Sequence, residues 1–390
     1  MARKMKDSGI EWIGEIPEGW ETINPKALFA QRKDRASKGE RQLTSSQQYG
    51  ILYQDEYMEL TGSKVVTVGK DFDILKHVET GDFVISMRSF QGGLEYSTKS
   101  GAISSAYVML VPNLELVYPR FYRWLLKSSV YIDALQRTTN MVRDGQAMRY
   151  SNFAQVRLFT LPLDEQKSRA DFLDLECSSI DKILFKTRSS IEEYKKLKQA
   201  VITQAVTEGT PAMFSSPHSV KLKYLISIVS GEAIRNEQLS DFGEYPVYGG
   251  GEIIGFCSQY NTSEGSLIIG RVGARCGCVT HTTCKSWATD NALIVLPTCN
   301  AKYMYYVIGH CQLNNLNTSN AQPLITSTKI KNVVVPYFSD AMQQQEIADY
   351  LDAKCAKIDG LIAKKEQLVK ELESYKKSLI YEVVTGKREV

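Results

Sequence analysis

The sequence predicts an α+β protein with two globular domains in a pseudo-twofold arrangement, joined by two long helices that form an antiparallel coiled coil. Three observations support this fold. A helical segment occurs twice, its apolar residues follow a coiled-coil spacing, and the residues before each copy contain short strand-like runs separated by loops. A chain of 390 residues that is 43% hydrophobic is long enough to build two cores.

The duplicated segment covers residues 166–207 and 344–385, which align without a gap at an offset of 178 positions. Fourteen of the 42 aligned positions are identical. They are Gln166/Gln344, Ala170/Ala348, Asp171/Asp349, Leu173/Leu351, Asp174/Asp352, Cys177/Cys355, Ile180/Ile358, Asp181/Asp359, Lys186/Lys364, Glu193/Glu371, Lys198/Lys376, Ile202/Ile380, Val206/Val384 and Thr207/Thr385. This internal repeat predicts that the protein does something twice.

Apolar residues follow a heptad spacing in both copies, and neither copy contains a proline between its ends. Each copy can therefore form a helix of about 60 Å at 1.5 Å per residue. Because the two apolar stripes match, we expect the helices to pair with each other inside one chain. Polar residues such as Lys198 and Lys376 interrupt the stripes at equivalent points and can fix the register. The alternative is that each helix packs only on its own domain.

The helices divide the chain into a globular block at 1–160, a helix at 161–209, a second block at 210–338 and a helix at 339–390. Both blocks contain runs with strand composition followed by a helix-like segment. The predicted strands are Val65–Val68, Asp82–Met87, Tyr107–Val111, Leu267–Gly270 and Ala292–Leu296, and the predicted helices are Pro119–Leu135 and Lys302–Cys311. The order of these elements is the same in both blocks.

The net charge of the chain is only +3. A nucleic-acid-binding protein often carries a much larger positive charge, so the composition permits DNA binding without demanding it. The basic start of the sequence is followed by charged and aromatic residues and not by an apolar run, and no stretch is long and apolar enough to span a membrane. We therefore expect a cytoplasmic protein.

Six of the eight cysteines lie in the second block, with two histidines nearby. These cysteines are Cys257, Cys276, Cys278, Cys284, Cys299 and Cys311. Structural zinc sites usually use ligand pairs separated by two to four residues, and Cys276-Gly277-Cys278 leaves too little chain for such a pair. We expect buried free thiols and no metal, with a zinc site as the minor alternative.

Beside the duplicated helix, the chain contains the segments Asp7–Trp20, Tyr245–Gly251, Gly270–Gly277 and Thr289–Ala292, and in this order they resemble the DNA-specificity subunit of type I restriction-modification systems. The start of the chain, Asp7 to Trp20, resembles the usual start of such subunits. In the second block the segments Tyr245–Gly251, Gly270–Gly277 and Thr289–Ala292 are similar to a common target-recognition pattern, which Ala321–Thr326 follows. The resemblance extends over nearly the whole chain.

This resemblance implies a function and a set of partners. Each globular block would be a target-recognition domain that reads one half of a split sequence in double-stranded DNA, and the helices would set the distance between the two readers. Two modification subunits would dock on the chain and methylate adenines, and restriction subunits could join them. No cofactor is expected in this chain, whereas S-adenosylmethionine, ATP and magnesium are expected on the partner subunits.

Candidate DNA-binding residues come from loops in which glycine accompanies long polar side chains. Arginine suits guanine, asparagine and glutamine suit adenine, and serine or threonine can contact several bases. The candidates are Arg88, Ser89, Gln91, Ser105, Tyr107, Arg143, Gln146, Tyr248, Arg271, Arg275, Ser319, Asn320 and Gln322. Ordinary turn chemistry is the alternative for each of them. Asp290 and Asn291 are expected to fix a loop.

Catalysis by this chain is not expected. The sequence near Asn24-Pro25 lacks the motif of an amino-methyltransferase, and the chain has no glycine-rich phosphate loop. Glu165-Gln166-Lys167 imitates half of a nuclease metal site, but it opens the repeated helix, where acidic residues suit the helix dipole. Two other functions stay open, a scaffold protein that joins partners through its coiled coil and a nuclease built around Glu165 and Lys167.

Overall fold

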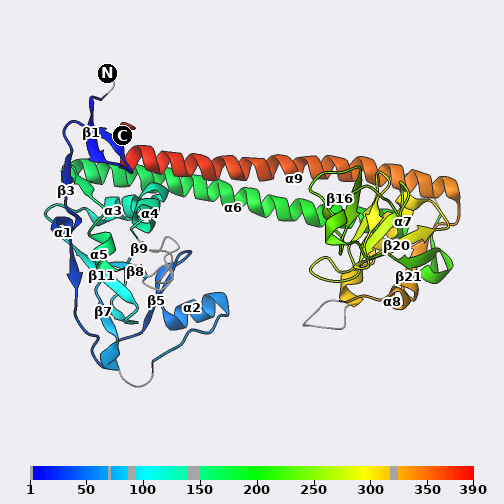
Figure 1. Ribbon diagram of the computed structural model, residues 1–390, viewed down its shortest axis with the longest axis horizontal. Coiled ribbons are helices and arrows are strands. Elements are labelled where there is room, and N and C mark those ends of the chain that lie inside the picture. Colours follow the sequence, from blue (N-terminus) through cyan, green and yellow to red (C-terminus); the bar gives the residue numbers. More distant parts are fainter. Residues whose placement is uncertain (1–2, 69–71, 87–93, 139–148, 214, 317–323) are drawn as a thin grey trace. The chain divides into compact units, whose positions relative to one another are not determined.

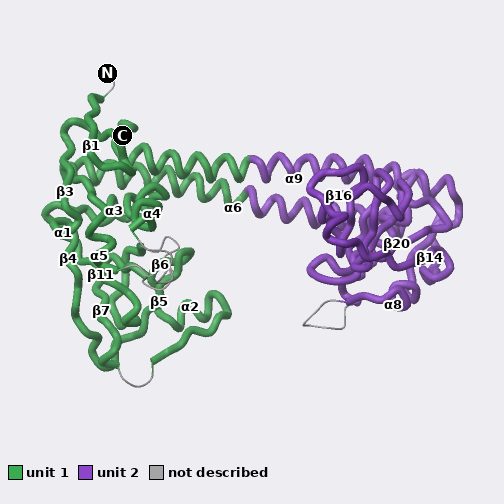
Figure 2. The backbone as a smooth tube through the Cα atoms, in the orientation of Figure 1, with its two compact units in different colours: residues 1–186, 368–390 green, residues 187–367 purple. Residues whose placement is uncertain are grey.

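The computed structural model describes residues 3–68, 72–86, 94–138, 149–213, 215–316 and 324–390. It divides into two compact units, shown in different colours in Figure 2. Unit 1 contains residues 1–186 and 368–390, and unit 2 contains residues 187–367. Each unit therefore combines one globular block with parts of both long helices.

Unit 1 is built on a four-stranded antiparallel sheet with the strand order β4-β11-β8-β9. Its strands are β1 (Met5–Ile10), β2 (Gly14–Pro17), β3 (Glu21–Ile23), β4 (Phe29–Arg32), β5 (Leu43–Ser46), β6 (Gly50–Tyr53), β7 (Lys76–Val78), β8 (Phe83–Ser86), β9 (Leu94–Tyr96), β10 (Gly101–Ile103), β11 (Tyr107–Pro112) and β12 (Leu158–Thr160). Its shorter helices are α1 (Pro25–Leu28), α2 (Gln54–Thr61), α3 (Pro119–Leu126), α4 (Ser129–Gln136) and α5 (Tyr150–Phe153) (Figure 1).

Unit 2 contains a four-stranded antiparallel sheet with the order β14-β20-β17-β18. Its strands are β13 (His218–Lys221), β14 (Ile226–Ser230), β15 (Tyr245–Tyr248), β16 (Ile253–Cys257), β17 (Leu267–Gly270), β18 (Val279–His281), β19 (Trp287–Ala288), β20 (Ala292–Pro297) and β21 (Val334–Tyr337). Its shorter helices are α7 (Ala301–His310) and α8 (Ser327–Lys331).

The two units repeat one topology. In both sheets the second strand in sequence, β8 or β17, lies at an inner position, and the third strand, β9 or β18, lies at the edge beside it. A hairpin, β5–β6 or β15–β16, is inserted before that inner strand, and in both units the first hairpin strand runs parallel to the segment that precedes the other inner strand. Unit 1 additionally contains the hairpin β1–β2 and helix α2.

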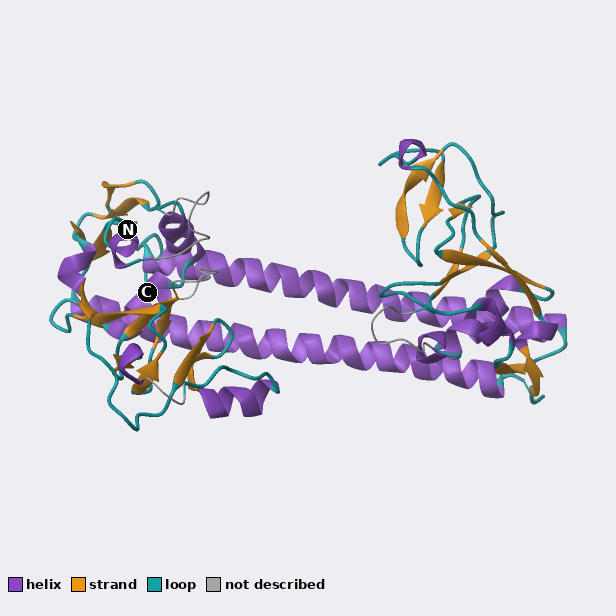
Figure 3. Cartoon of the chain, turned by 60° about the horizontal axis from the view of Figure 1, so that its bottom comes forward, coloured by secondary structure: helices purple, strands orange, loops and turns teal. Residues whose placement is uncertain are grey.

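The two long helices are α6 (Leu163–Glu208) and α9 (Ala341–Val384), drawn in purple in Figure 3. Within each unit, the start of one helix packs on the globular block and also on the end of the other helix. In unit 1 the buried residues of this contact are Ala170, Leu173, Cys177, Ile180 and Leu184 from α6 with Leu379, Val383 and Val384 from α9. In unit 2 they are Ala205 and Val206 from α6 with Ile347, Ala348, Leu351 and Cys355 from α9. Each long helix therefore packs on its own globular block and also pairs with the other long helix.

Ion pairs between the helices confirm the antiparallel pairing and explain the polar interruptions. In unit 1 the Lys376 ammonium lies 2.5 Å from an Asp181 carboxylate oxygen. In unit 2 the Lys198 ammonium lies 2.7 Å from an Asp359 carboxylate oxygen. Because Asp181 corresponds to Asp359 and Lys198 to Lys376 in the repeat, the same pair forms twice with the helices exchanged. Each lysine meets its aspartate only in this register of the two helices, so the two ion pairs can fix the register.

A buried glutamine joins each globular block to its helix. The Gln166 side chain accepts a hydrogen bond from the Tyr118 amide at 2.7 Å and donates to the carbonyls of Leu116 and Leu161, both at 2.8 Å. The equivalent Gln344 accepts from the Asn300 amide at 3.1 Å and donates to the Phe338 carbonyl at 2.6 Å. Both side chains are buried, so these bonds satisfy backbone groups that water cannot reach.

An aspartate about two turns further along each long helix provides a second contact between the helix and its globular block. Asp174 accepts hydrogen bonds from Trp124 at 2.7 Å and from Arg120 and Arg123. The equivalent Asp352 accepts from the Tyr306 hydroxyl and the Lys302 ammonium, both at 2.7 Å. Burial alone would raise the pKa of each carboxyl group, yet the hydrogen bonds and nearby cations lower both pKa values. An aromatic donor and a cation thus hold the domain against the helix in both units.

Two local expectations were wrong. The predicted helix Pro119–Leu135 is broken into α3 and α4, because Ser128 is extended and its hydroxyl donates to the Leu125 carbonyl at 2.7 Å. The predicted strand Val65–Val68 is irregular, and the exposed fraction of Val66 is 87%. No strand pairs with it in the described residues; the Gln42 side chain binds both the amide and the carbonyl of Val68.

Candidate nucleic-acid interface

Three loops of unit 2 meet at one end of its four-stranded sheet. They are the β15–β16 turn, the segment after β17, and the turn before β20. The Thr289 amide donates to the Tyr248 carbonyl at 2.9 Å, and the Arg271 amide donates to the Asn291 carbonyl at 3.0 Å. The structure therefore brings together the three glycine-rich or polar motifs that the sequence suggested.

Glycine is required at this meeting point by close backbone approach. A side chain at Gly270 would overlap the Gly250 carbonyl, and a Cβ atom at Gly250 would lie 2.6 Å from the Val272 carbonyl oxygen. Gly251 has a φ of 111°, which disfavours any residue with a side chain. The β15–β16 turn in unit 2 is consequently tight, and Glu252 is its one residue with a side chain.

The two predicted arginines of unit 2 differ in their surroundings. Arg275 is exposed, and its Nε lies 2.8 Å from a Glu252 carboxylate oxygen. Arg271 is half-buried, and its backbone is fixed on both sides, because its carbonyl also accepts from the Ile325 amide at 3.0 Å. Within the described part of the chain its guanidinium makes no hydrogen bond or ion pair. Arg271 therefore offers a positioned backbone with donors left for an external partner.

Tyr248 occupies a different environment from the one expected of a DNA contact. It is 8% exposed and packs with Ile268, Ala288, Ala292 and Ile294. Burial raises the pKa of its hydroxyl. Its position supports a role in packing the hairpin onto the sheet rather than contact with DNA.

The turns before β11 and β20 have the same geometry. In unit 1 the Tyr107 amide donates to the Ser104 carbonyl and the Ala106 amide donates to the Ser104 hydroxyl at 3.3 Å. In unit 2 the corresponding bonds join Ala292 to the Thr289 carbonyl and Asn291 to the Thr289 hydroxyl, the latter also at 3.3 Å. Ser105, Asp290 and Asn291 are exposed in these turns. Asn291 thus fixes its loop through its backbone, and its side chain is free to face solvent.

Tyr107 begins strand β11 and pairs with Ser86, the last described residue before the segment 87–93. It is half-buried. Eight other predicted residues lie outside the described residues. They are Arg88, Ser89, Gln91, Arg143, Gln146, Ser319, Asn320 and Gln322. In unit 2 Leu324, the first described residue after the segment 317–323, forms an antiparallel bridge with Val272 in the loop after β17.

The sequence interpretation missed one loop of unit 1. Residues 47–49 form the tip of the β5–β6 hairpin, which occupies the topological position of Gly249–Glu252 in unit 2. All three residues, Gln47, Gln48 and Tyr49, are exposed. The run Ser45-Ser46-Gln47-Gln48-Tyr49-Gly50 was the available signal, because polar residues before a glycine are typical of a hairpin turn.

Glu165, which resembled part of a nuclease site, is engaged in structural contacts. It forms an ion pair with Arg3, accepts from Trp20 at 3.1 Å and from Arg169 at 2.7 Å. Burial disfavours the charged carboxylate, but these three donors lower its pKa to about 2. Arg169 also binds the carbonyls of Val383 and Arg388, so the cluster holds the end of α9 in unit 1.

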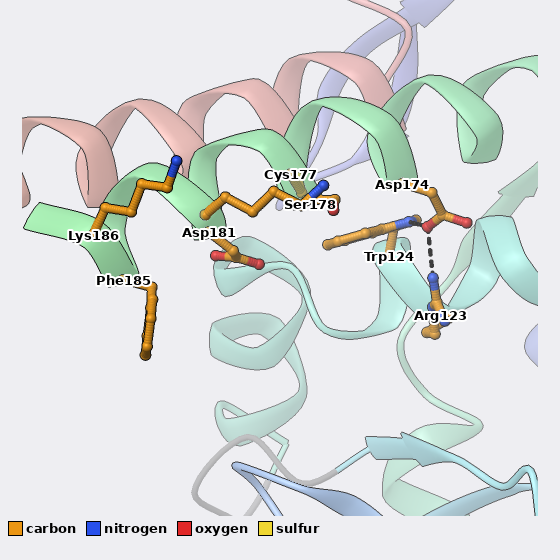
Figure 4. Close-up of a pocket in the computed structure, with 9 residues that line it drawn as sticks. Arg123, Trp124, Asp174, Cys177, Ser178, Asp181, Phe185 and Lys186 are labelled. Carbon is orange, nitrogen blue, oxygen red and sulfur yellow. Dashed lines mark hydrogen bonds and ion pairs between the residues drawn. The ribbon is translucent and has the colours of Figure 1, made fainter. Parts of the chain in front are cut away.

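A groove of about 610 Å³ lies along α6 in unit 1 (Figure 4). Trp124 lies against the helix near Cys177 and Ser178, and Phe185 projects from the same helix further along (Figure 4). Phe185 is 74% exposed. In unit 2 the repeat places Ala363 where Phe185 stands, so the Phe185 ring has no counterpart there.

All eight cysteines are free. Among the residues that the structure describes, no group of three histidine, cysteine, aspartate or glutamate side chains is arranged to hold a metal ion. Over the same residues, no helix combines the length and the apolar character needed to cross a membrane.

Comparisons with known proteins identify related chains. Residues 218–371 match the family model described as the type I restriction modification DNA specificity domain. The type I restriction enzyme EcoprrI specificity subunit of Escherichia coli is 29% identical over 110 residues, which are 28% of this chain and 27% of that protein. The match thus spans about a quarter of that curated relative.

Two solved structures share the fold. A chain from a study of complex assembly and conformational transition of the type I R-M system has a TM-score of 0.75 at 14% identity, with 96% of this chain and 99% of that chain covered. The HsdS subunit of Thermoanaerobacter tengcongensis has a TM-score of 0.53 at 14% identity, with 96% and 98% covered. These likenesses extend over both units and both long helices.

Proposed function

We propose that this chain is a type I restriction-modification DNA specificity protein, which the match of residues 218–371 to that family model supports, and that it reads a bipartite DNA target with one recognition domain per half-site. The domains are residues 1–160 and 210–338, and the helices at 161–209 and 339–390 act as the spacer. The observation that carries this proposal is the duplication: each unit has the same strand order in its four-stranded sheet and a hairpin inserted before the second strand of that sheet. A target in two parts requires two readers of this kind.

The chain itself is proposed to be non-catalytic. Two modification subunits would supply the adenine methyltransferase activity with S-adenosylmethionine, and restriction subunits would supply ATP- and magnesium-dependent cleavage. A net charge of +3 favours an assembly in which partners contribute much of the phosphate contact, while this chain contributes mainly base contacts. The nuclease alternative loses support because Glu165 is already held by Arg3, Trp20 and Arg169.

Arg271 is the described residue best placed to read a base in unit 2. Replacement of Arg271 by alanine should remove about 1–3 kcal/mol of discrimination at one position of one half-site, because arginine binds guanine through two hydrogen bonds. The other half-site should be read as before. Competition binding of the assembled complex to duplexes substituted at single positions measures this effect.

An exposed arginine of the same unit provides the matched control. Arg235 lies in the loop after β14, and Arg235→Ala should leave the discrimination at every position unchanged. An equal and sequence-independent weakening by both substitutions would show that Arg271 contributes only general positive charge.

The groove beside Phe185 is the proposed docking surface for a modification subunit. An exposed aromatic ring beside a cleft is typical of a protein interface, and such anchors often contribute 2 kcal/mol or more. Phe185→Glu should therefore weaken binding of the modification subunit by at least about 10-fold, with no change in the sequence recognised. Titration of the labelled full-length chain with the modification subunit measures the affinity.

Ile183→Glu is the control for this docking surface. Ile183 is 47% exposed, and two residues along a helix correspond to a rotation of about 200°, so it lies on the opposite side of α6 from Phe185. If both variants bind the modification subunit as tightly as the unchanged chain does, this groove is not the docking surface.

Sequencing of methylated adenines in host DNA tests the proposed function as a whole. Strains with and without this gene are compared while the modification subunit is expressed in both. The expected result is a motif of two defined halves around a fixed gap that disappears on deletion. An unchanged methylation map would favour the scaffold alternative.

A further inference from the structure

We infer that the tip of the β5–β6 hairpin, Gln47–Tyr49, is a base-reading element of unit 1 and that Gln48 contacts a base directly, with adenine as the base that its amide suits. This inference rests on the proposed function and extends it to residues that no motif had indicated. Three observations carry it: the position of the hairpin, the exposure and chemistry of its tip, and a helix that braces it.

The position of the hairpin follows from the topology. In unit 2 the β15–β16 turn packs on the loop after β17, since a Cβ atom at Gly251 would lie 3.2 Å from the Arg275 Cβ. In unit 1 the β5–β6 hairpin packs beside β9, because a Cβ atom at Gly50 would lie 3.9 Å from a carboxylate oxygen of Glu95 on that strand. Gln42, just before β5, also forms a parallel bridge with Ala102 in the strand that leads to the Ser104–Tyr107 turn.

The tips of the two hairpins differ in what they present. In unit 2 close contacts restrict Gly249, Gly250 and Gly251 to glycine, and the fourth turn residue, Glu252, pairs with Arg275. In unit 1 the turn is three residues long and ends at Gly50, whose φ of 72° closes it without side-chain crowding. The three tip positions are thus free to carry long side chains, and this sequence places two glutamines and a tyrosine there.

Gln48 has the chemistry of a base reader. It is exposed, and in the described part of the chain its amide has no hydrogen-bond partner. A glutamine amide can donate to N7 and accept from N6 of adenine in the major groove, and this bidentate pairing distinguishes adenine from the other bases. Tyr49 is 39% exposed and lies beside it at the tip.

Helix α2, which has no equivalent in unit 2, braces this hairpin (Figure 1). The helix buries none of its own residues, so core packing does not explain its presence. The Tyr49 and Tyr57 rings meet edge to face with centroids 6.4 Å apart. Arg41 and Lys99 bind the first turn of the helix through Asp55 at 2.8 Å and Glu56 at 2.6 Å, respectively. Tyr57 is accordingly a positioning residue, which acts on DNA through Tyr49.

The test begins with the methylated motif of the unchanged chain, which also tests the proposed function separately. If no bipartite motif depends on the gene, the proposed function fails before the hairpin is examined. If the motif is present, the strain is changed to Gln48→Ala. The expected result is that one position of one half-site becomes degenerate while the other half-site is unchanged. An identical motif in both strains overturns the inference.

If the variant methylates too poorly to give a motif, competition binding of the purified complex measures its base discrimination instead. Duplexes carry the wild-type site or one substituted base, and Gln48→Ala should lose about 5- to 150-fold of discrimination at a single position. Uniform weakening on all duplexes would mean that the hairpin touches only phosphates, which overturns base reading. Gln155→Ala, which changes another exposed glutamine of unit 1, should have no effect on discrimination.

The bracing role of α2 is tested with two variants of Tyr57. Tyr57→Ala should reduce discrimination at the same position as Gln48→Ala, because the hairpin tip loses its support. Tyr57→Phe keeps the ring and should restore the discrimination of the unchanged chain. Equal discrimination by the alanine variant and the unchanged chain would remove α2 from the recognition site.

Discussion

Replacement of Arg169 by leucine should lower the free energy of unfolding by about 3–5 kcal/mol, since it breaks a buried ion pair and also leaves two backbone carbonyls without their donor. Arg169 is 1% exposed and contacts Glu165 at 2.7 Å. It also donates to the carbonyls of Val383 at 2.8 Å and Arg388 at 2.9 Å, so its loss releases the end of α9 from unit 1. Chemical denaturation of the full chain, followed by circular dichroism, measures the change.

The same substitution at an exposed ion pair is the control. The Arg137 side chain is 71% exposed and lies 3.3 Å from Glu11, and Arg137→Leu should cost less than about 1 kcal/mol. A second variant, Glu165→Gln with Arg169→Leu, removes both charges and should recover part of the loss. A loss for Arg169→Leu as small as that of the control would contradict the structural role of this cluster.

The effect of Arg169→Leu should depend on pH in a defined direction. The pKa of Glu165 falls from 4.5 to about 2 in the folded chain. A carboxyl group with a lowered pKa stabilises the fold above its unfolded pKa, and this contribution is lost as the pH falls through the folded pKa. The difference between the unchanged chain and the variant should therefore be full at neutral pH and shrink between about pH 4.5 and 2.

Replacement of Gln344 by leucine should lower the free energy of unfolding by about 2–4 kcal/mol. The substitution leaves the Asn300 amide and the Phe338 carbonyl without partners, and each unsatisfied buried group costs about 1–3 kcal/mol. Gln166→Leu should cost at least as much, because three backbone groups lose their partner in unit 1. Thermal and chemical unfolding of the full chain report both losses.

Gln345→Leu provides a control at the adjacent residue. Gln345 is exposed and binds the Asn300 side chain at 2.7 Å, so its replacement should cost less than about 1 kcal/mol. Similar losses at positions 344 and 345 would mean that helix propensity, and not the buried backbone contacts, determines the effect.

The duplicated segment allowed the sequence to predict the helices and their pairing, because heptad spacing and repeated identities are local properties of the chain. The repeat also contains Gln166, Asp174 and their counterparts among its identical positions. Their roles could not be predicted, because their partners lie about 50 residues away in other elements. The break between α3 and α4 was missed because a single serine, Ser128, turns the backbone there.

The candidate site was predictable only in part. Glycine motifs identified the Gly249–Gly251 turn and the Gly270–Gly277 segment, since close backbone approach demands glycine at those positions. The Gln47–Tyr49 tip carries no such requirement, and the position of its hairpin beside β9 and β10 depends on contacts that are distant in sequence. Tyr248 was predicted to contact DNA because it lies beside glycines. Its sequence position does not show which side of the strand its side chain faces.

The exchange of helix ends between the two units imposes an order on biosynthesis. Unit 1 requires residues 368–390, whereas unit 2 is complete once residue 367 has been made. During translation the block made first must therefore wait for the segment made last, with the binding surface for Leu379, Val383 and Val384 uncovered in the meantime. A ribosome that stops after residue 367 would release a chain in which unit 1 lacks residues 368–390 and leaves this apolar surface exposed.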